Sequence, residues 1–84
     1  MKLATVTGTV TATAKDAQLT GQKLLLCTSG DGELVAVDTV GAGVGDQVLI
    51  AVGSAARMAA GTTSLPVDAA ILAVVDRVEK VKKR

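Results

Sequence analysis

The sequence predicts an all-β fold in which five short strands and one short helix form a small barrel. Two observations predict it. The apolar residues fall into short runs of aliphatic and β-branched side chains, and glycine-rich turn signals separate these runs. The chain has 84 residues, which is enough for one domain. Closing the sheet would remove exposed edges, so an OB-like barrel is the first choice and an open meander that pairs with its neighbour is the second.

The first half of the chain predicts three strands. From Leu3 to Thr13 apolar residues broadly alternate with threonine, as in a half-buried strand, and Gly8 marks a bend or bulge. The apolar run Lys23–Thr28 is long enough for a strand and too short for a stable helix. The turn residues Ser29–Gly32 join it to Leu34–Asp38, which predicts a β-hairpin.

The second half predicts two strands, a helix and a tail. Gln47–Val52 is the fourth strand. Gly53–Ala60 contains good helix formers and predicts one or two helical turns. The fifth strand is expected from Val67 or Asp68 to Val75. Residues 77–84 alternate weakly and are interpreted as a tail or an edge strand.

The composition predicts self-association. Hydrophobic residues make up 49% of the chain, yet it has no Phe, Trp or Tyr, so the core must be built from small side chains. A domain of this size buries only about 60–65% of its unfolded surface and needs further stabilisation. A disulfide within the chain is excluded because Cys27 is the single cysteine, and the lack of histidine argues against a zinc site. Neighbouring copies are therefore expected to cover part of the apolar surface.

The charge distribution argues against a nucleic-acid partner and a membrane. Net charge is +1, but residues 1–78 carry five basic against seven acidic side chains, a balance of −2, and the other basic residues crowd the last five positions. OB-like barrels bind single strands by stacking bases on aromatic side chains in a basic groove. An oligonucleotide-binding module is still the main alternative function for such a barrel. We expect no signal peptide and no membrane span.

The segment Gly41-Ala42-Gly43-Val44-Gly45 is the most distinctive motif. It resembles a dinucleotide fingerprint only superficially, because the third glycine comes one residue early and a strand rather than a helix follows. Two interpretations remain open: a turn that needs positive φ, or bare backbone that lets another subunit approach closely.

The sequence gives little support for a catalytic function. Without histidine there is no His-based acid or triad, and Ser54 lacks a G-x-S-x-G elbow. Cys27 lies in an apolar run, where a thiol packs as a small hydrophobe. No spacing among the aspartates matches a calcium loop. Arg57 is isolated on an apolar helix, so it either binds a carboxylate across an interface or lies free on the surface.

Taken together, these segments resemble the EutN/CcmL family of bacterial microcompartment and carboxysome vertex proteins. The resemblance covers nearly the whole chain up to Asp76. The most specific segment is Ala36–Leu49, with AVDTVGAGVGDQVL. The other matching segments are Met1–Val10, Thr13–Asp16, Gly21–Leu25, Gly53–Arg57 and Pro66–Asp76.

The resemblance implies an OB-like barrel that assembles into a cyclic, pentameric ring with no catalysis, cofactor or metal. It implies a structural shell protein of a bacterial microcompartment, in residues 1–78, with a basic tail at 79–84. The implied partners are other copies of the chain and hexameric shell proteins. With the glycine spacing and the isolated arginine, it predicts these subunit-interface residues: Asp38, Gly41, Ala42, Gly43, Gly45, Asp46 and Arg57.

Overall fold

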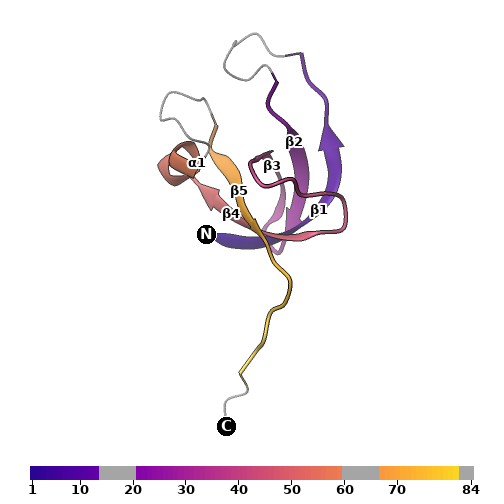
Figure 1. Ribbon diagram of the computed structural model, residues 1–84, viewed down its shortest axis with the longest axis vertical. Helices are drawn as coiled ribbons and strands as arrows, with labels where there is room; N and C mark the ends of the chain where they lie inside the picture. Colours follow the sequence, from indigo (N-terminus) through magenta and orange to yellow (C-terminus); the bar gives the residue numbers. More distant parts are fainter. Residues whose placement is uncertain (14–20, 60–66, 82–84) are drawn as a thin grey trace.

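A computed structural model describes residues 1–13, 21–59 and 67–81 of the chain. In these residues five strands form a closed barrel with the spatial order β1-β2-β3-β5-β4, and one short helix lies beside it (Figure 1). The elements are β1 (Lys2–Val10), β2 (Leu24–Ser29), β3 (Gly32–Asp38), β4 (Gln47–Val52), α1 (Ser54–Ala59) and β5 (Ala69–Val74). The predicted all-β barrel is confirmed, and the open meander was wrong because the sheet closes on itself.

The predicted hairpin is formed by β2 and β3. These strands pair antiparallel from Leu24 opposite Val37 to Ser29 opposite Gly32. β3 therefore begins two residues before the predicted Leu34, because the tight turn lets the ladder continue to its end.

β1 ends at Val10, three residues before the predicted Thr13. The reason is pairing: β2 begins at Leu24, which lies opposite Val10, so residues after Val10 have no partner in this ladder. The predicted irregularity at Gly8 is confirmed, since the β1–β2 register shifts between Val6 and Gly8.

The barrel is closed by β5, which lies between β4 and β3. It pairs antiparallel with β4 over most of its length, but it meets β3 in parallel through only Val37 opposite Ala70 and Asp38 opposite Ile71. β5 begins at Ala69 and ends at Val74, slightly inside the predicted bounds. Beyond it, residues 76–81 belong to no strand and run away from the barrel as a tail (Figure 1).

Helix α1 connects β4 towards β5 and packs against both strands, with Ala56 fully buried. It confirms the predicted helical turns within Gly53–Ala60, of which Ala60 lies outside the described residues. No helix in the described ranges is long and apolar enough to cross a membrane.

The barrel interior is filled by small aliphatic side chains. Its largest fully buried members include Leu25, Ile50 and Ile71, each contributing about 1.5–3 kcal/mol by burial. The core cluster consists of Ala4, Val6, Leu25, Cys27, Ala36, Ala42, Val48, Ile50, Ala69 and Ile71. Many apolar side chains nevertheless remain on the outside, as the composition predicted.

Candidate functional site

The glycine-rich segment, residues 39–46, forms a loop between β3 and β4 that Asp38 anchors at its start. Asp38 Oδ1 accepts hydrogen bonds from the backbone N–H groups of Val40 and Gly41, each at 3.0 Å. The side chain of Asp38 is only 1% exposed. A carboxylate that accepts two backbone N–H groups holds the first turn of the loop in one conformation.

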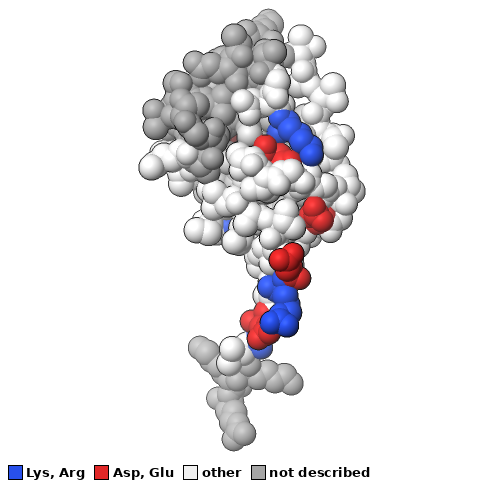
Figure 2. Space-filling model, in the orientation of Figure 1, with Lys and Arg blue, Asp and Glu red and all other residues white. Residues whose placement is uncertain are grey.

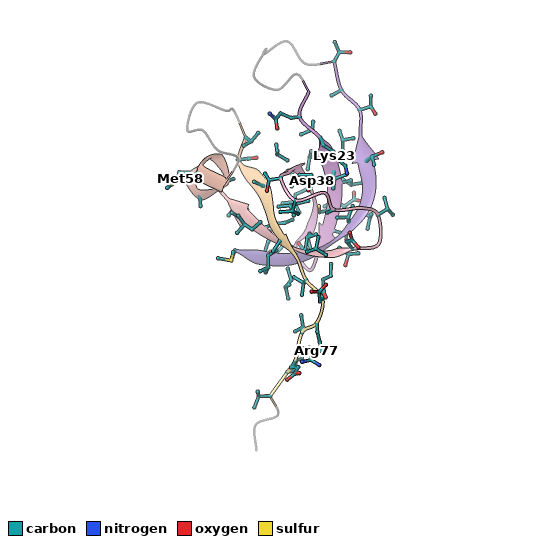
Figure 3. The ribbon with its side chains drawn as sticks, viewed as in Figure 1. Lys23, Asp38, Met58 and Arg77 are labelled. Atoms are coloured by element: carbon teal, nitrogen blue, oxygen red, sulfur yellow. The ribbon has the colours of Figure 1, made fainter. Side chains whose placement is uncertain are left out.

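Lys23, the residue directly before β2, also holds this loop (Figure 3). Its Nζ lies 3.3 Å from Asp38 Oδ2 as an ion pair and donates a hydrogen bond of 2.9 Å to the carbonyl of Ala42. The backbone adds a further link, because the Asp38 N–H donates to the Lys23 carbonyl at 2.8 Å. One lysine thus connects the start of the loop with its middle.

The environment of Asp38 favours its ionised form. Burial alone would raise the pKa of this carboxyl, but backbone hydrogen bonds from the loop and the contact with Lys23 outweigh burial. The pKa of Asp38 is therefore held below its usual range, and the carboxylate stays charged at neutral pH.

The far end of the loop is fixed by Asp46 and by β1. Asp46 Oδ2 accepts from the Gly43 N–H at 2.9 Å, while the Asp46 N–H donates to the Gly43 carbonyl at 3.0 Å. Gly45 N–H donates to the Val6 carbonyl, and Val6 N–H donates to the Asp46 carbonyl. The loop is thus tied to the barrel at both ends.

The glycines of the loop divide into two groups. Gly41 and Gly45 have φ of 80° and 96°, which side chains with a Cβ rarely adopt, so the turn interpretation holds for both. Gly43 has no positive φ, and an added Cβ would meet only Asp46 Oδ2 at 3.9 Å, an ordinary contact. Within the protomer, neither φ nor space requires glycine at position 43.

The loop presents apolar side chains outward. Val44 is 65% exposed and Val40 is 41% exposed, whereas Ala42 between them is buried in the core. The hydrogen-bonded loop therefore exposes Val40 and Val44 within five residues of one another, with Gly43 next to Val44. Such a surface can pack against another apolar surface without first being ordered.

The predicted site residues are thus brought together only in part. Asp38 and Asp46 direct their carboxylates into the protomer, and Ala42 packs inside. Arg57 lies on α1, and its side chain is outside the described part of the structure. Sequence reasoning missed Lys23, although the hairpin register could have found it, since the ladder places Lys23 next to the pair Leu24–Val37 and hence opposite Asp38.

Within residues 1–13, 21–59 and 67–81 there is no candidate metal site, and Cys27 is enclosed in the barrel. No three His, Cys, Asp or Glu side chains there could hold a metal ion. Cys27 is fully buried, and burial, followed by the nearby Asp38 charge, raises the pKa of its thiol. A protonated, enclosed thiol is inert, as the core interpretation predicted.

Charged side chains on the face shown in Figure 2 are spaced apart on the barrel and gather along the tail. In the described residues the ion pairs are Lys2–Asp31, Lys23–Asp38 and Arg77–Glu79. The described residues on this face present charges of both signs.

A second surface feature is a groove of about 470 Å³ near the junction of β3, β4 and β5. Val35 and Val52, which line it, are each 44% exposed, and the exposed acidic residue Asp68 also lines it. The remaining lining residues are Leu34, Gly53 and Ala69.

Comparison with known proteins gives consistent matches across the chain. Residues 1–76 match the family model described as ethanolamine utilisation protein EutN/carboxysome. The carboxysome shell vertex protein CcmL of Thermosynechococcus vestitus is 47% identical over 87 residues, covering 95% of this chain and 88% of the relative. The microcompartment shell vertex protein PduN of Salmonella typhimurium is 46% identical, covering 90% and 96%. The solved GrpN pentameric microcompartment shell protein from Rhodospirillum rubrum superimposes with a TM-score of 0.85 at 40% identity, covering 96% and 100%.

Proposed function

This chain belongs to the EutN/CcmL family, and from that premise we propose that it is a structural shell subunit whose copies form the pentameric vertices of a bacterial microcompartment. The observation that carries the proposal is the family match over residues 1–76, which spans every strand of the barrel. The family consists of shell proteins and not of enzymes, so the chain is a structural protein located in a shell.

A geometric requirement explains why such a subunit is needed. Hexagonal tiles alone cover a plane, so a closed polyhedral shell requires tiles with fewer sides at its corners. A single head-to-tail interface repeated around a cyclic axis generates such a tile. The expected partners are therefore other copies of this chain and hexameric shell proteins that surround the ring.

The glycine loop suits the contact between copies. Its backbone is already ordered by Asp38, Lys23 and Asp46, so little conformational entropy is lost when a neighbour packs on it. Val40 and Val44 supply apolar area, and the free space beside Gly43 allows close approach. We propose that residues 39–46 and Arg57 belong to the subunit interface, with Asp38 and Asp46 acting indirectly by shaping the loop.

The oligonucleotide-binding alternative is disfavoured by composition and charge. The chain has no aromatic side chain on which a base could stack, and residues 1–78 have a net charge of −2. An OB-like barrel without stacking platforms and without a basic groove lacks both sources of affinity for single strands.

Oligomeric state and binding are tested on the purified full chain by native mass spectrometry and light scattering, together with a fluorescent single-stranded DNA titration. We expect rings of five copies and no DNA binding. A folded monomer that binds the oligonucleotide would overturn the proposal. Replacing Gly43→Val should shift rings towards monomers without unfolding the barrel, and Arg57→Ala should act in the same direction.

The shell role is tested by co-expression with a hexameric shell protein of a related microcompartment. With this chain present, electron microscopy should show closed polyhedra, and without it open sheets or tubes. Identical assemblies in both cases would contradict a vertex role even if the chain forms rings.

A further inference from the structure

The barrel is closed by a short seam that leaves part of β3 without a partner. In the described residues β3 meets β5 only at Val37 and Asp38, so the stretch Gly32–Ala36 has β2 on one side and no strand on the other. An unpaired strand edge offers backbone N–H and C=O groups that a further extended segment can use.

The groove described above lies along this free edge. Leu34 and Val35 of β3 form one wall, and the end of β4 and the start of β5 form the other. Two of its lining side chains, Val35 and Val52, are apolar and each 44% exposed, and exposed Asp68 adds an acidic residue to the lining. The groove therefore fits an extended segment that carries an aliphatic side chain and a nearby cation.

The tail of this chain, residues 76–81, has these features. Its last backbone link to the barrel is the hydrogen bond from Val75 N–H to the Gln47 carbonyl. Arg77 and Glu79 form an ion pair at 2.9 Å, as expected of residues two apart on one face of an extended chain. Val78, 46% exposed, and Lys80 fall on the opposite face.

The tail does not reach the groove of its own barrel. The groove lies where β5 begins, at Asp68 and Ala69, whereas the tail follows the end of β5 at Val74. Figure 1 shows the tail continuing away from the barrel in the direction opposite to that start. A six-residue extended segment spans about 20 Å, enough to cross to an adjacent molecule.

We propose that the tail of one copy lies in the groove of the next copy and adds a strand to the free edge of β3. Val78 packs against Val35 and Val52, and Lys80, two residues further, lies near Asp68. The contact is head-to-tail, because tail and groove are different surfaces, and such a contact repeated around an axis forms a ring when the rotation closes. It deepens the ring assembly proposed above and rests on it.

Charge exchange tests this pairing on the full-length protein, with ring population measured by native mass spectrometry. Lys80→Asp and Asp68→Lys should each lower the ring population by about tenfold, because each places like charges together. The double variant should restore the rings. Arg77→Asp is the matched control: it makes the same charge change on the opposite face of the tail and should leave the rings intact.

A cysteine pair tests the geometry directly. When the single variants Val35→Cys and Val78→Cys are mixed and oxidised, a disulfide-linked pair of chains should appear on a non-reducing gel. A mixture of Val35→Cys and Arg77→Cys should give much less. Cys27 does not interfere, because it is fully buried.

The outcomes separate this inference from the vertex assignment. Wild-type chain that forms no ring would remove the vertex proposal and this one together. Wild-type rings that survive Lys80→Asp as well as Arg77→Asp, or a double variant that does not recover, would overturn the tail contact alone. Deleting residues 76–84 gives a further check, since the shortened chain should remain folded by circular dichroism and lose its rings.

Discussion

The glycine loop and the tail are both exposed and both carry apolar side chains, yet they are built in opposite ways. Residues 39–46 are held by two aspartates, by Lys23 and by β1. Residues 76–81 contain one exposed ion pair and join no strand. The loop is ordered before any partner arrives, whereas a tail that joins no strand would lose conformational freedom on docking and would contribute less affinity per unit of buried area.

The largest effect should come from removing the anchor of the loop. Asp38→Ala leaves two backbone N–H groups without their acceptor and Lys23 without its ion-pair partner, which should lower the free energy of unfolding by about 2–3 kcal/mol. Urea denaturation measures this, and ring formation should fall with it. The control is Asp31→Ala, whose ion pair with Lys2 is exposed and which should change stability little. Equal stability of both variants would show that the loop does not depend on its anchor.

A pH series tests whether the charge of Asp38 contributes to this anchor. Because the pKa of Asp38 is lower in the folded chain than in the unfolded chain, its contribution to stability is complete above the unfolded value of about 4. It is lost as pH falls through the folded value. Urea unfolding at pH 7, 5 and 3 should therefore show the wild type losing its advantage over Asp38→Asn at acid pH. A constant difference between the two would mean that the carboxylate charge is not involved.

Substitutions at two glycines of the loop distinguish a glycine that the backbone conformation requires from one that leaves room for a neighbouring copy. Gly45→Ala forces a Cβ into positive φ and should cost about 1–2 kcal/mol of stability. Gly43→Ala meets no such strain and should leave thermal unfolding of the barrel nearly unchanged. Equal destabilisation by Gly43→Ala and Gly45→Ala would contradict the conclusion that the protomer leaves space for a Cβ at position 43.

The smallest effect on the barrel itself should come from the tail. The described part of the tail, residues 76–81, contributes no strand pairing and no core side chain. Removing residues 76–84 should therefore change the unfolding free energy of the monomeric chain by less than about 0.5 kcal/mol. Chemical denaturation in dilute solution measures it. A decrease in unfolding free energy several times larger would show that the tail stabilises its own barrel.

Local pattern was sufficient for the hairpin and for β4, because Gly30-Asp31 marks the turn and the apolar run of Gln47–Val52 matches its strand. The ends of β1 and β5 were less accurate because a strand stops where its partner stops, and the partner is remote in sequence. The two-residue parallel seam between β3 and β5 depends on closure of the whole sheet. No local signal encodes it.

The loop shows the same limit at the level of single residues. The composition of the motif Gly41–Gly45 marks a distinctive segment, but it does not reveal that the Asp38 carboxylate accepts hydrogen bonds from the loop backbone. That placement follows from the hairpin register, which brings Lys23 alongside. The groove beside β3 was not predicted, since its walls come from three strands that meet only in the closed barrel.

The enclosed thiol of Cys27 gives this protein a built-in reporter. Its side chain is reached by no solvent in the folded barrel, and the sequence contains no other cysteine. A thiol-specific reagent can therefore modify the chain only when the wall formed by β2 swings open, so the labelling rate measures how often this happens. The chain has no tryptophan or tyrosine whose fluorescence could be followed. The labelling rate of Cys27 therefore offers a way to measure how much the docking of one molecule on another slows the local opening of each barrel.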